Sequence, residues 1–159
     1  MKRITKLLVV TAILTMIFAM PVMAREVSFS SENTDYLITL LNNNTAKLRT
    51  GLAEFAKTQT GPKADAVIAA QTALVENKIA AVNKECAQNH IACLTQKVND
   101  AKADQKRALD QINSIKLLQG NAVTNECVAA QAQYDAATAN LAAKEAYLAQ
   151  AQVKLAPYM

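Results

Sequence analysis

The residues with the clearest capacity for chemistry are three cysteines and a single histidine. Cys86, His90 and Cys93 stand at positions i, i+4 and i+7, so they would share one face of a helix. Two thiolates and an imidazole are suitable ligands for copper(I) or zinc. No fourth ligand is evident, and in an oxidising compartment a disulfide competes for the same thiols. We therefore expect a Cys86–Cys93 disulfide beside an exposed His90, with a metal site as the alternative.

Whether that disulfide can form depends on the chain between the two cysteines. On a continuous helix their separation is a rise of about 10.5 Å, which exceeds the roughly 7 Å limit for the Cα atoms of a disulfide. A turn at Asn89 would bring them together. Cys127 is different, because a chain reversal at Gly120 would leave it roughly 30 Å from Cys93. We expect Cys127 either to bridge two chains or to lie in the core as a small hydrophobic residue.

The sequence lacks the residue patterns of common catalytic sites. A serine–histidine–acid triad would have to use His90, and no G-x-S-x-G sequence is present. The three glycines stand far apart, which excludes a glycine-rich phosphate-binding loop. We therefore expect no enzymatic activity and no cofactor.

Residues 1–24 have the composition of a secretory signal peptide. Lys2, Arg3 and Lys6 give a positive start, residues 7–20 form an uncharged and mostly apolar run, and Ala24 is a small residue at the expected cleavage site. The apolar run is shorter than the roughly 20 residues needed to span a bilayer. The sequence thus predicts cleavage after Ala24, a periplasmic or secreted location, and no membrane span in the mature chain.

The charge of the mature chain gives no indication of a nucleic-acid partner. Three of the 17 basic residues lie in the signal, so 14 remain against 13 acidic residues. Lysine and arginine are interspersed with aspartate and glutamate, whereas a nucleic-acid-binding protein normally has a basic patch or stripe. We expect no nucleic-acid binding.

Beyond the signal the chain is dominated by helical patterns. Residues 25–32 are expected to form an extended lead to a helical domain over residues 33–159, with breaks at Gly61-Pro62 and at Gly120. Between the breaks, apolar residues recur at heptad spacing: Leu37, Leu41, Leu48 and Phe55; Ile68, Val75, Ile79, Val82 and Cys86; Cys127, Tyr134, Leu141, Leu148 and Leu155. The sequence predicts an all-α fold, an up-down helical bundle of three or four long alanine-rich helices with coiled-coil-like packing.

The number of helices depends on the middle of the chain. After Cys93 the apolar stripe restarts one position later, at Leu94, Val98 and Ala101. This shift indicates either an irregularity within one long helix over residues 62–119 or a turn at residues 88–91. Matched lengths of about 28 residues for segments 33–60, 62–88 and 92–119 favour the turn, and hence a four-helix bundle.

These features favour an exported, non-catalytic structural or protein-interaction module. The heptad stripes, the thin alanine core and the odd number of cysteines indicate a protein partner or self-association as a homodimer. Two alternatives remain open: an extracytoplasmic holdase-type chaperone, and a soft-metal binding protein that uses Cys86, His90 and Cys93.

Overall fold

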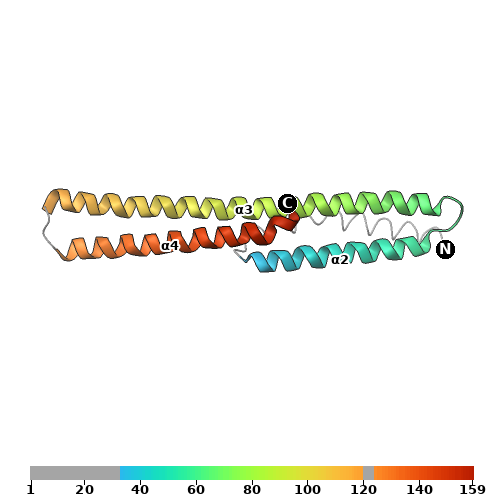
Figure 1. Ribbon diagram of the computed structural model, residues 1–159, viewed down its shortest axis with the longest axis horizontal. Helices are drawn as coiled ribbons and strands as arrows, with labels where there is room; N and C mark the ends of the chain where they lie inside the picture. Colours follow the sequence, from blue (N-terminus) through green and yellow to red (C-terminus); the bar gives the residue numbers. More distant parts are fainter. Residues whose placement is uncertain (1–32, 120–123) are drawn as a thin grey trace. The chain divides into compact units, whose positions relative to one another are not determined.

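The computed structural model describes residues 33–119 and 124–159, and this part of the chain is almost entirely helical (Figure 1). It contains the long helices α2 (Thr34–Thr58), α3 (Ala64–Gln119) and α4 (Asn125–Leu155), followed by the short 3-10 helix η1 (Ala156–Tyr158). No strand occurs among the described residues. The all-α helical bundle predicted from the sequence is confirmed, with three long helices. The signal peptide and the extended lead lie outside the described residues.

The start of α2 and the loop that follows it obey simple capping rules. Oδ1 of Asn33 accepts a hydrogen bond from the backbone N–H of Tyr36 at 3.1 Å, and Asp35 places a negative charge in the first turn. After Thr58 the chain reverses through Gly61, whose φ of 101° lies in the left-handed region that glycine adopts most readily. The sequence therefore placed this break correctly.

Helix α3 runs through residues 88–91 without interruption, so the predicted turn there is wrong. Through this part of α3 the buried stripe consists of Val82, Cys86, His90, Leu94 and Val98. Each is four residues from the next, and because four residues exceed one turn of 3.6, every step rotates the buried stripe slightly around the helix. This rotation produces the shift in the sequence pattern. A continuous backbone accommodates it without glycine or proline.

The chain divides into two compact units, and α3 contributes to both. The first contains the described residues up to His90 together with Leu155–Met159, and the second spans Ile91–Lys154. None of the helices in the described part is long and apolar enough to cross a membrane.

In the first unit, α2 and the beginning of α3 present their predicted stripes to the core. The buried apolar residues are Leu37, Leu41, Leu48, Leu52 and Phe55 from α2, and Val75, Ile79, Val82, Cys86 and Ala87 from α3. Burial of one leucine or phenylalanine side chain stabilises a fold by roughly 1.5–3 kcal/mol. On the surface, the Arg49 guanidinium donates two hydrogen bonds to the Glu76 carboxylate, at 2.8 Å each. This paired contact aligns α2 with α3.

The second unit is a helical hairpin with a coiled-coil seam. Seven positions of α3, spaced alternately four and three residues apart, are buried or half-buried: Leu94, Val98, Ala101, Gln105, Ala108, Ile112 and Ile115. In α4 the seam contains the predicted Cys127, Tyr134, Leu141 and Leu148, all half-buried, and the buried Ala130 and Ala151. Polar contacts also join the helices: Gln105 donates to the Thr138 hydroxyl at 2.9 Å, Gln119 donates to the Glu126 carboxylate at 2.6 Å, and Lys102 lies 3.1 Å from Glu145.

Candidate interaction surface and the predicted cysteine site

His90 is buried, which corrects the expectation that it would be exposed. Only 1% of His90 and 3% of Thr34 is accessible to solvent. Nε2 of the imidazole lies 3.1 Å from the hydroxyl oxygen of Thr34 at the start of α2. This contact joins two residues that are 56 positions apart in the sequence. It positions the start of α2 against α3.

Cys86 is a buried thiol with little chemical reactivity. Burial, with a smaller contribution from the negative charge of Glu85, raises the pKa of the Cys86 thiol to about 11. At neutral pH the thiol is therefore protonated, whereas nucleophilic attack and metal binding require the thiolate. Cys86 acts here as a small hydrophobic residue on the stripe between Val82 and His90.

All three cysteines are free, and Cys93 and Cys127 are half-buried. Cys86 and Cys93 lie on the unbroken helix α3, seven residues apart, so the turn on which their predicted disulfide depended does not exist. A rise of about 10.5 Å along the helix separates them, and this exceeds the roughly 7 Å between Cα atoms that a disulfide can span.

The predicted metal ligands do not form a metal centre either. No group of three or more histidine, cysteine, aspartate or glutamate side chains in the described residues is arranged to hold a metal ion. The imidazole of His90 lies against Thr34 inside the first unit, and Cys93 belongs to the second. The shared helix face that the sequence spacing indicated is therefore not a shared site.

The different environments of the cysteines predict different alkylation rates. In native protein at pH 8, we expect iodoacetamide to modify Cys86 at least ten times more slowly than Cys93 and Cys127, because roughly one Cys86 thiol in a thousand is ionised when its pKa is about 11. Mass spectrometry of peptides after timed labelling measures this. In denatured protein all three rates should converge, and equal native rates would contradict the buried position of Cys86.

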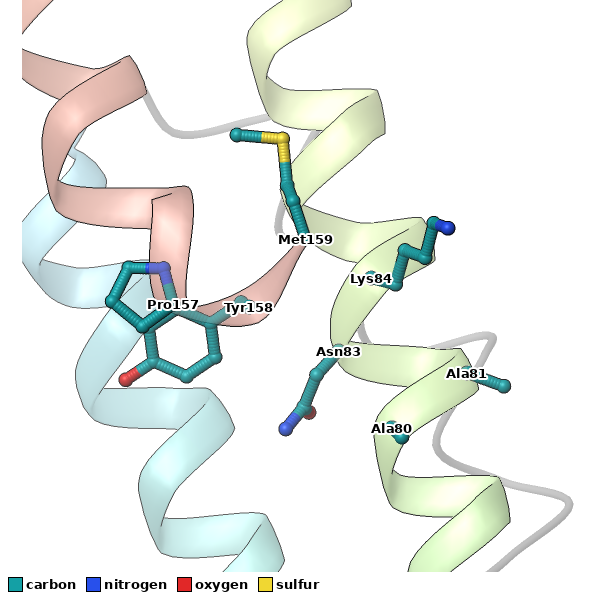
Figure 2. A pocket seen from close by; sticks show the side chains of 7 residues that line it. All are labelled: Ala80, Ala81, Asn83, Lys84, Pro157, Tyr158 and Met159. Atoms are coloured by element: carbon teal, nitrogen blue, oxygen red, sulfur yellow. The ribbon is translucent and has the colours of Figure 1, made fainter.

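A hollow of about 330 Å³ occurs in the first unit between α3 and the C-terminal residues (Figure 2). Its lining residues are Ala80, Ala81, Asn83, Lys84, Pro157, Tyr158 and Met159. Nδ2 of Asn83 donates to the Thr45 hydroxyl at 3.4 Å, and the Tyr158 hydroxyl donates to Oδ1 of Asn42 at 2.9 Å. Figure 2 shows Asn83 and Lys84 leaving α3 in different directions. The hollow is thus mainly apolar, without converging polar groups.

A second surface feature of the described residues is the outer face of α4. It consists of a second stripe, again spaced alternately four and three residues apart, and every member is exposed: Val128, Ala132, Asp135, Ala139, Ala142, Ala146, Ala149 and Val153. At 100° per residue this stripe lies nearly opposite the seam on the same helix. Val128 and Val153, at its ends, are 57% and 76% accessible to solvent. We call these eight residues the outer α4 stripe.

The composition of the outer α4 stripe differs from that of an ordinary solvated helix face, which carries charged residues. Asp135 is its one charged member, and its carboxylate accepts a hydrogen bond from Nε2 of Gln131 at 2.9 Å. Alanine permits close approach of a second helix, as small residues generally do. The arrangement suits helix–helix packing by coiled-coil geometry.

The heptad pattern through Cys127 and Tyr134 predicts only the seam of α4. It does not predict the outer α4 stripe, because alanine indicates a helix whether its side chain is buried or exposed. A search of the other phases for alternating steps of three and four residues would have found Val128 to Val153.

Comparison with known proteins finds no matching protein family, no matching curated protein and no matching solved structure.

Proposed function

We propose that this chain is an exported, non-catalytic helical protein that acts as a structural or protein-interaction module. The observation that carries the proposal is the outer α4 stripe, a heptad pattern of exposed alanine and valine residues along most of α4. A stripe of this periodicity suits packing against another helix, because exposed alanine and valine side chains stabilise a protein only when another surface covers them.

The partner we propose is a second copy of the chain. The outer α4 stripe has similar residues at equal distances from its midpoint, between residues 140 and 141. If two α4 helices pair in opposite directions about that point, Val128 of one copy faces Val153 of the other, and Ala132 faces Ala149. Asp135 then faces Ala146, and a single polar position in such a seam fixes the register at some cost in stability. Cys127 lies on the other stripe of α4, so this association requires no disulfide.

Ala142→Glu tests the proposed homodimer. A carboxylate at the centre of the outer α4 stripe would be buried without a partner, so we expect the dimer dissociation constant to rise at least tenfold. Sedimentation velocity over a range of concentrations, under reducing conditions, measures the change. Ala129→Glu is the matched control, because Ala129 is an exposed alanine of the same helix outside the stripe. A monomeric wild-type protein, or equal effects of both variants, would rule out this dimer.

Export is the second part of the proposal. It is supported by the positive start, the apolar run and Ala24 in the first 24 residues. When the full chain is expressed in a bacterium with a secretion pathway, we expect the intact mass of the product to correspond to a protein that begins at Arg25. Recovery of the uncleaved chain from the cytoplasm would overturn this assignment.

A further inference from the structure

We draw no further inference here: the strongest candidate, the hollow of the first unit between α3 and the C-terminal residues, carries no ligand proposal because the buried Oδ1 of Asn83, which has no hydrogen-bond partner among the described residues, presents no surface that a ligand could reach.

Discussion

Asn89→Pro should lower the free energy of unfolding by about 3 kcal/mol or more, which is the cost of proline inside a helix. Proline removes the hydrogen bond that the N–H of residue 89 donates within the helix, and its ring collides with the carbonyl of residue 85. Because α3 is continuous here and contributes residues to both compact units, a break at residue 89 should destabilise both units. Urea unfolding monitored by circular dichroism at 222 nm, under reducing conditions, measures the loss.

The control for this variant is Asn89→Ala. Alanine has a higher helix propensity than asparagine. The free energy of unfolding of the control should therefore lie within about 0.5 kcal/mol of the wild-type value or slightly above it. If Asn89→Pro were instead as stable as the wild type, the chain would turn at residues 88–91. That outcome would restore the four-helix bundle and, with it, the Cys86–Cys93 disulfide.

The helical stripes could be predicted from the sequence because burial follows the helical period. Leu37, Leu41, Leu48 and Phe55 are all buried in α2, as their heptad spacing indicated. The breaks at Gly61-Pro62 and near Gly120 were also predictable, since both fall where the helices end. Periodicity identifies the face of each helix that is buried, and Gly61, with a φ of 101°, allows the chain to reverse after α2.

The shift in the stripe near Cys93 could not be resolved in the same way. A change of phase is compatible with a turn and with a rotating stripe on one helix, and the two differ in tertiary packing rather than in local propensity. The absence of glycine and proline from residues 88–91 was the evidence for a continuous helix. The matched segment lengths, which favoured a turn, do not determine whether the helix continues through these residues.

The predicted Cys86–Cys93 disulfide depended on the same turn. With a turn at Asn89, Cys86 and Cys93 could meet and His90 would lie in an exposed loop. On a continuous helix, steps of four residues carry the buried stripe from Cys86 to His90 and then to Leu94. The position of the histidine thus depends on the path of the stripe, which the sequence pattern left open.

His90 is the second position where substitution should have a large effect. His90→Ala is expected to lower the free energy of unfolding by roughly 2–5 kcal/mol, the range found when large buried side chains are truncated to alanine. It removes a side chain that is 1% exposed and leaves a cavity beside Thr34. Chemical denaturation measures the change. A loss below about 0.5 kcal/mol would indicate the exposed histidine that the sequence suggested.

The hydrogen bond between His90 and Thr34 can be separated from the packing of the imidazole by a double-mutant cycle. His90→Leu keeps most of the buried volume, and Thr34→Val replaces the hydroxyl by a methyl group of similar size. If the 3.1 Å contact joins the start of α2 to α3, the two substitutions together should destabilise the protein less than the sum of their separate effects. The expected coupling is about 0.5–3 kcal/mol, the range for residues in direct contact. Additive effects would mean that shape alone holds this end of α2, and that the polar pair contributes no specificity to the alignment of the two helices.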